Sequence, residues 1–76
     1  MQDNKRKSAR IMVRFLRQTG YSMPRIAKAI GVSVATVFRL EHGGSELRDP
    51  AAYGRLVWVY ERRAHELDSI VAEARR

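Results

Sequence analysis

The chain has 76 residues, which is enough for one domain with a modest hydrophobic core, so oligomerisation is an expected source of further stability. It contains no cysteine, which excludes disulfides and thiolate metal sites, and no apolar run approaches the roughly 20 residues of a membrane span. The formal net charge is +7, and this excess lies within residues 1–30, because residues 31–76 are neutral.

The uneven charge predicts two kinds of surface. Residues 1–30 carry eight basic side chains against the single acid Asp3, whereas residues 31–76 carry seven of each sign. A positive surface suits a polyanion, which releases condensed counterions on contact, and the neutral part is better suited to another protein. Because the basic N-terminus is not followed by the apolar segment of a signal peptide, we expect a cytoplasmic protein without membrane association.

Residues 1–7 are predicted to be a basic N-terminal arm, since they are polar and contain Lys5, Arg6 and Lys7. Such an arm can reach phosphates or a minor groove, as homeodomain arms do. A solvated tail explains the same residues equally well.

A first helix is predicted over residues 8–19, where apolar residues recur at helical spacing, and Gly20 is a suitable helix stop. The residues with this spacing are Ala9, Met12, Val13 and Leu16, widened by Ile11 and Phe15. Arg10, Arg14 and Arg17 share a stripe that we expect to face away from the core and to flank a phosphate backbone. The alternative is a solvated face without a ligand.

Two short helices joined by a sharp turn are predicted next. Ser22 is suited to cap the first of them, and Pro24 falls in its first turn, where the missing N–H has no partner to lose. Gly31 supplies the left-handed conformation that reverses the chain. The buried face of this helix is predicted to contain Ile26, Ala27 and Ile30.

The second helix of the pair is predicted over residues 33–42, with Ser33 as its N-cap. Val37 and Leu40 lie three residues apart on its inward face. Ala27 has to be small, because the second helix crosses it closely.

The pattern in residues 22–43 resembles the helix-turn-helix of the phage repressor/Cro (XRE-type) DNA-binding family. The matching residues are apolar Ile26, small Ala27, apolar Ile30, turn Gly31, apolar Val32, Val37 and Leu40, and the helix end Arg39-Leu40-Glu41-His42-Gly43. The resemblance implies that the second helix enters the major groove while the first crosses the backbone. The chain departs from the family in having one long helix after the pair, where two short ones are usual. A helical hairpin that only packs is the alternative.

The resemblance implies that base edges are read from the positions of Val34, Ala35 and Arg39, and Thr36, on the same outward side, is a further candidate for reading bases. Arg39 can donate two hydrogen bonds to guanine O6 and N7, whereas Val34 and Ala35 suit a thymine methyl group. An outward Arg39 that is only solvated is the alternative.

Phosphate contacts are expected from hydroxyls, helix N-termini and basic side chains. The candidate residues are Ser22, Arg25, Lys28, Ser33 and Thr36, together with Arg10, Arg14 and Arg17. The family often has Gln at the position of Met23, and because Met23 cannot reach a phosphate, Arg25 or a backbone N–H is expected to substitute. The two serines are explained equally well as helix caps alone.

Two further side chains of the second helix have expected positions. We expect Phe38 to pack beside the C-terminal helix, with insertion against a sugar or thymine as the alternative. Glu41 resembles the family's helix-end acid, which pairs with a basic residue of the first helix.

A helix of about 25 residues is predicted from Asp49-Pro50, an N-cap followed by proline, to the C-terminus. Its apolar residues form a heptad seam of Tyr53, Val57, Tyr60, Ala64, Leu67, Val71 and Ala74. A narrow stripe projecting past a small domain would stay wet, so we expect a homodimer interface. Its residues would be Val57, Tyr60, Ala64, Leu67 and Val71. The alternative is that the whole helix folds onto its own domain.

The sequence therefore predicts an all-α protein with a basic arm (1–7), a helix-turn-helix core (8–48) and a C-terminal dimerisation helix (49–76). The expected function is that of a sequence-specific, homodimeric regulator that binds palindromic or repeated double-stranded DNA and represses phage, mobile-element or autoregulated genes. A protein-interaction module resembling an antitoxin or adaptor, and a sequence-tolerant architectural DNA binder, are the alternatives. No enzymatic activity, cofactor or metal is expected, because the only histidines, His42 and His65, are far apart and no phosphate-cradling loop is present.

Overall fold

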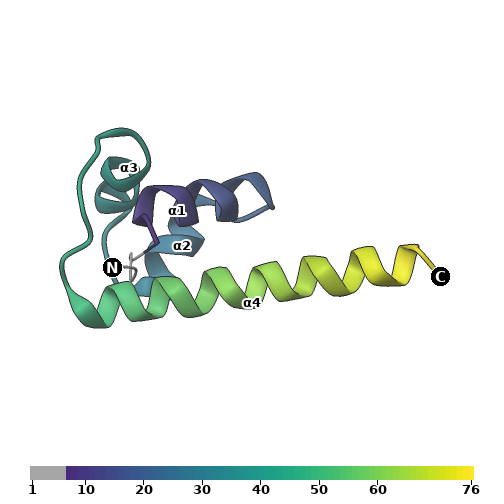
Figure 1. Ribbon diagram of the computed structural model, residues 1–76. Coiled ribbons are helices and arrows are strands. Elements are labelled where there is room, and N and C mark those ends of the chain that lie inside the picture. The colour runs from purple at the N-terminus through teal and green to yellow at the C-terminus, as the bar shows by residue number, and fades with distance from the viewer. Residues whose placement is uncertain (1–6) are drawn as a thin grey trace.

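The computed structural model describes residues 7–76, so the expected N-terminal arm lies outside the described residues except for Lys7. Four helices follow one another along the chain (Figure 1). They are α1 (Ala9–Gln18), α2 (Met23–Ile30), α3 (Val34–His42) and α4 (Pro50–Ala74). Residues 7–76 contain no strand, and the predicted all-α fold with a central helix-turn-helix and a long C-terminal helix is confirmed.

Each helix begins at a side-chain cap that the sequence supplies. The oxygens of Ser8, Ser22, Ser33 and Asp49 accept hydrogen bonds from backbone N–H groups two or three residues later, at 3.4, 3.2, 3.1 and 3.1 Å. Such a cap typically stabilises a helix by about 1 kcal/mol. Between α2 and α3, Gly31 has a φ of 79°, and its N–H donates to the carbonyl of Ala27. This left-handed residue turns the chain sharply enough for α3 to pack on α2.

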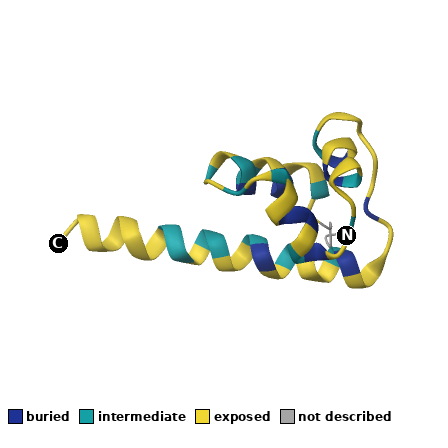
Figure 2. Cartoon of the chain, turned by 180° about the vertical axis from the view of Figure 1, so that it is seen from behind, coloured by how far each residue is buried: buried dark blue, intermediate teal, exposed yellow. Residues whose placement is uncertain are grey.

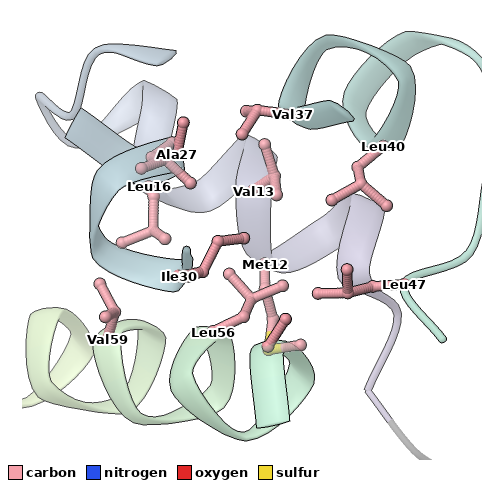
Figure 3. Close-up of a cluster of buried hydrophobic side chains, with 12 residues drawn as sticks. Met12, Val13, Leu16, Ala27, Ile30, Val37, Leu40, Leu47, Leu56 and Val59 are labelled. Carbon is pink, nitrogen blue, oxygen red and sulfur yellow. The ribbon is translucent and has the colours of Figure 1, made fainter. Parts of the chain in front are cut away.

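The core lies where α1 and α2 form a layer between α3 on one side and α4 on the other (Figure 1). Figure 3 shows Val37 and Leu40 pointing inward from α3, and Leu56 and Val59 pointing inward from α4. The buried core residues are Met12, Val13, Leu16, Ile26, Ala27, Ile30, Val37, Leu40, Leu47, Ala52, Leu56 and Val59. Because α3 is held by one face only, its opposite face is left exposed.

Helix α4 packs on α1 and α2 with its first half and then runs past them (Figures 1 and 2). Its buried residues are Ala52, Leu56 and Val59. The first part of the predicted heptad seam, Tyr53, Val57 and Tyr60, is half-buried against the same core. The ring of Tyr60 lies edge-on to that of Phe15, with 5.1 Å between the centroids. The apolar first half of α4 is therefore used by its own domain.

Two arginines of α4 hold the ends of the neighbouring helices, and sequence analysis did not single them out. Arg55 Nε donates to the carbonyl of Ile30, the last residue of α2, at 3.0 Å. Arg63 donates to the carbonyl of Thr19, the C-cap of α1. Terminal carbonyls lack intrahelical partners and carry the negative end of the helix dipole, so a guanidinium stabilises both ends.

None of the helices in residues 7–76 combines the length and the apolar composition that a bilayer crossing requires.

Candidate nucleic-acid interface

The exposed face of α3 carries the residues predicted to read bases. Val34 is 45% exposed, and Ala35 and Arg39 are also exposed, whereas Thr36 is half-buried. Val37 and Leu40 on the opposite face are buried in the core. No other part of the described chain covers this face, so it is available to a ligand.

Side chains at the start of α3 form a short hydrogen-bonded chain. Ser33 Oγ accepts the backbone N–H of Thr36 at 3.1 Å and lies 2.9 Å from Thr36 Oγ1. Arg39 Nη2 donates to Thr36 Oγ1 at 3.3 Å. Ser33 therefore caps α3, which is one of the two roles predicted for it. It also belongs to a hydrogen-bonded group that includes Arg39.

Two basic residues of α2 are exposed to solvent. Arg25 is exposed near the N-terminus of α2, with its guanidinium carbon 3.9 Å from the centroid of the Tyr21 ring. Lys28 is exposed one turn later. Ser22 caps α2 through the N–H of Arg25. The stacking on Tyr21 restricts Arg25 to one side of the helix end, and sequence analysis had not identified this tyrosine.

The predicted arginine stripe of α1 is only partly correct. Arg10 and Arg14 are exposed as expected. Arg17 is half-buried, and its Nη1 donates to Glu41 Oε1 at 2.8 Å. The expectation that all three arginines face away from the core is wrong at Arg17, because the end of α3 crosses α1 there. The expected partnership between Glu41 and a basic residue of the first helix is confirmed, and the partner is Arg17.

The expected position of Phe38 is wrong. Phe38 is 52% exposed, and the centroid of its ring lies 4.7 Å from that of the His42 ring. It cannot pack beside α4, because the layer of α1 and α2 separates α3 from α4. Phe38 and His42 instead add an aromatic pair to the exposed side of α3.

The charged side chains of residues 7–40 are all positive. Between residues 7 and 40 the sequence has no acidic residue and seven basic ones, Lys7, Arg10, Arg14, Arg17, Arg25, Lys28 and Arg39. Glu41, the first acid after them, is neutralised by Arg17. A surface of this composition attracts an anion and offers little repulsion to it.

The predicted dimerisation residues differ in how far they are exposed. Val57 and Tyr60 are half-buried against the core of their own domain. Ala64 and Leu67 are also half-buried, whereas Val71 is 47% exposed and its neighbour Ile70 is 60% exposed. Of the five predicted interface residues, only Val71 is therefore exposed.

A further exposed feature lies between α2 and α4. Trp58 is 60% exposed, and the guanidinium carbon of Arg62 lies 5.2 Å from the centroid of its ring. Beside it is a hollow of about 540 Å³, lined by Ala29, Ala51, Gly54, Arg55, Trp58 and Val59.

Within residues 7–76, no group of three or more His, Cys, Asp or Glu side chains is arranged to hold a metal ion. No protein-family model, no curated protein and no solved structure matches the chain.

Proposed function

We propose that this protein is a sequence-specific double-stranded DNA-binding regulator of transcription that reads the major groove with α3. The observation that carries the proposal is the exposed face of α3, which presents Val34, Ala35 and Arg39. Residues 7–41 contain a single acid, Glu41, and Arg17 pairs with it. The resemblance of residues 22–43 to the phage repressor/Cro helix-turn-helix supports it. On this proposal the protein acts in the cytoplasm, as a repressor of phage, mobile-element or autoregulated genes.

The chemistry of that face divides into two tasks. Arg39 would donate to guanine O6 and N7, and Val34 and Ala35 would contact thymine methyl groups. Phosphates on either side of the bound α3 would be neutralised by Arg10, Arg14, Arg25 and Lys28. These contacts would fix the orientation of α3 on the DNA. Arg17 is a weaker candidate for a phosphate contact than predicted, because its guanidinium is bound to Glu41.

We also propose that two copies act together through the projecting end of α4. Residues 61–76 carry four basic and four acidic residues, whereas residues 7–60 carry nine basic and three acidic ones. Two copies can therefore approach at the neutral end of α4 without bringing their positive surfaces together. A two-fold dimer would bind a palindromic or repeated site with half-sites about 10 base pairs apart, or a multiple of that spacing.

The test is a salt titration of binding to two duplexes. One duplex is selected by the protein from random sequence, and the other has the same composition in scrambled order. We expect a large affinity ratio between them and a steep fall of both affinities with salt. Equal affinities with equal salt slopes would identify an architectural DNA binder instead.

A second candidate function is a protein-interaction module. The exposed Trp58 beside its apolar hollow favours it, because exposed aromatic residues next to apolar pockets are typical of binding hot spots. This function predicts no measurable binding to either duplex at physiological salt.

A further inference from the structure

The hydroxyl of Thr36 lies between Ser33, the N-cap of α3, and the guanidinium of Arg39. It lies 2.9 Å from Ser33 Oγ on one side and accepts from Arg39 Nη2 at 3.3 Å on the other. The backbone N–H of Thr36 also donates to Ser33 Oγ, at 3.1 Å. Residue 36 is thus tied to the cap by both its main chain and its side chain.

We propose that Thr36 is a positioning residue for Arg39, which holds the guanidinium in place before DNA binds, and that it does not itself read a base. The inference rests on the proposed function, since Arg39 matters only if it contacts a base pair. It replaces the role in base reading that the sequence predicted for Thr36.

The protons of this group are sufficient for all its hydrogen bonds. A hydroxyl has one proton and two lone pairs, and a guanidinium only donates. Thr36 Oγ1 can accept from Arg39 and give its own proton to Ser33 Oγ, which also accepts the N–H of Thr36. Ser33 then keeps its own proton, which remains available for a phosphate oxygen. The reverse orientation between the two hydroxyls leaves the proton of Thr36 available instead.

Thr36 is well suited to hold a neighbour still. A β-branched side chain has few χ1 rotamers in a helix, and Thr36 is half-buried, so its oxygen has a restricted position. Arg39 is exposed and would otherwise sample many rotamers. Anchoring one terminal nitrogen leaves the remaining N–H groups free for a base edge and reduces the ordering required on binding.

The first test measures Arg39 in the DNA-free protein. Nitrogen relaxation of the Arg39 Nε–H group reports its order parameter in the wild type and in two variants, Thr36→Val and Thr36→Ser. Valine keeps the shape of threonine without the oxygen, and serine keeps the oxygen without the methyl. We expect the order parameter to fall in Thr36→Val and to fall less in Thr36→Ser, which keeps the acceptor oxygen but loses the restriction by branching. Equal order parameters in the wild type and Thr36→Val would overturn the proposal.

The second test measures recognition. The probe is the duplex selected by the wild type, compared with a duplex altered at the base pair whose identity no longer matters in Arg39→Ala. In Thr36→Val we expect discrimination at that base pair to fall by about threefold to tenfold, with an unchanged salt slope, and we expect a smaller fall in Thr36→Ser. In the Arg39→Ala background, Thr36→Val should have no further effect.

Three results of the second test would overturn the positioning role. They are a loss of discrimination at a different base pair, a salt slope lowered by about one, or an equal effect of Thr36→Val without Arg39. If the wild type selects no duplex, the proposed function fails, and the order parameter of Arg39 alone then decides whether Thr36 holds it. Circular dichroism of each variant verifies that the fold is retained.

Discussion

Arg17 in α1 and Glu41 at the end of α3 form an ion pair, with 2.8 Å between Nη1 and Oε1. The carboxylate is largely buried, since its side chain is 13% exposed. The pair joins the helix that carries the candidate base-reading residues to the helix at the centre of the core. It therefore anchors the C-terminal end of α3 to α1.

Replacing Glu41 should therefore destabilise the domain. In Glu41→Ala the half-buried guanidinium of Arg17 loses its partner, and we expect a loss of about 1 kcal/mol in the free energy of unfolding. For a domain of this size that corresponds to a fall in Tm of roughly 4–8 °C. The matched control is Arg62→Ala, which removes the exposed pair with Glu66 at 3.7 Å and the contact with the exposed Trp58 ring, and which should change the free energy of unfolding by less than about 0.5 kcal/mol. Similar losses in the two variants would contradict this account.

Two glycines should respond to alanine in opposite directions. At Gly31 the φ of 79° is strained for any side chain, and a Cβ would lie 3.0 Å from Arg55 Nη2, so Gly31→Ala should lower the free energy of unfolding by about 1–2 kcal/mol. At Gly54, inside α4, a Cβ meets nothing within 4 Å, so Gly54→Ala should raise it by about 0.5–1 kcal/mol through helix propensity. Urea unfolding of both variants measures the two effects, and a stabilised Gly31→Ala would show that the turn differs from the one described.

Arg39 and Lys28 should have separable effects on DNA binding. Arg39→Ala should remove about 1–3 kcal/mol of discrimination at one base pair per half-site, because a bidentate contact with guanine is lost. Lys28→Ala should weaken binding to all sequences similarly and reduce the salt slope by about one, because a phosphate contact is lost. Titrations of selected and single-substituted duplexes at several salt concentrations measure both. A uniform loss of affinity in Arg39→Ala would reassign that residue to phosphate.

The projecting end of α4 should carry self-association. Val71→Glu places a charge on the exposed part of the apolar seam and should reduce self-association at least about tenfold, whereas Ser69→Glu adds the same charge away from the seam and should leave it unchanged. Sedimentation equilibrium over a range of protein concentrations measures the association. Because residues 69 and 71 are both exposed, neither substitution should alter the helical signal in circular dichroism. A dimer that survives Val71→Glu would place the interface elsewhere.

Much of the architecture could be predicted from the sequence, because its determinants are local. Ser8, Ser22, Ser33 and Asp49 each cap a helix within three residues of themselves, and Gly31 makes the turn by its own backbone freedom. The helical spacing of apolar residues then identified the core face of α1, α2 and α3. These features need no knowledge of distant contacts.

Part of the candidate site followed from the same local information. Val34, Ala35 and Arg39 were predicted to lie on the outer face of the second helix, and all three are exposed. Their angular positions around the helix are fixed once Val37 and Leu40 are known to face the core. The hydrogen bonds that join Ser33, Thr36 and Arg39 were not predicted. Ser33 and Arg39 both lie three residues from Thr36, so the spacing alone does not determine which of them its hydroxyl contacts.

Only the tertiary structure decided which side chains contact another helix and which stay exposed. It assigned the partner of Glu41, left Phe38 exposed, gave the first half of the α4 seam to its own domain, and placed Arg55 and Arg63 on the ends of α2 and α1. Each of these depends on contacts between residues far apart in the chain. Helical periodicity reports the direction of a side chain around its own axis, whereas the crossing of two helices determines what that side chain meets.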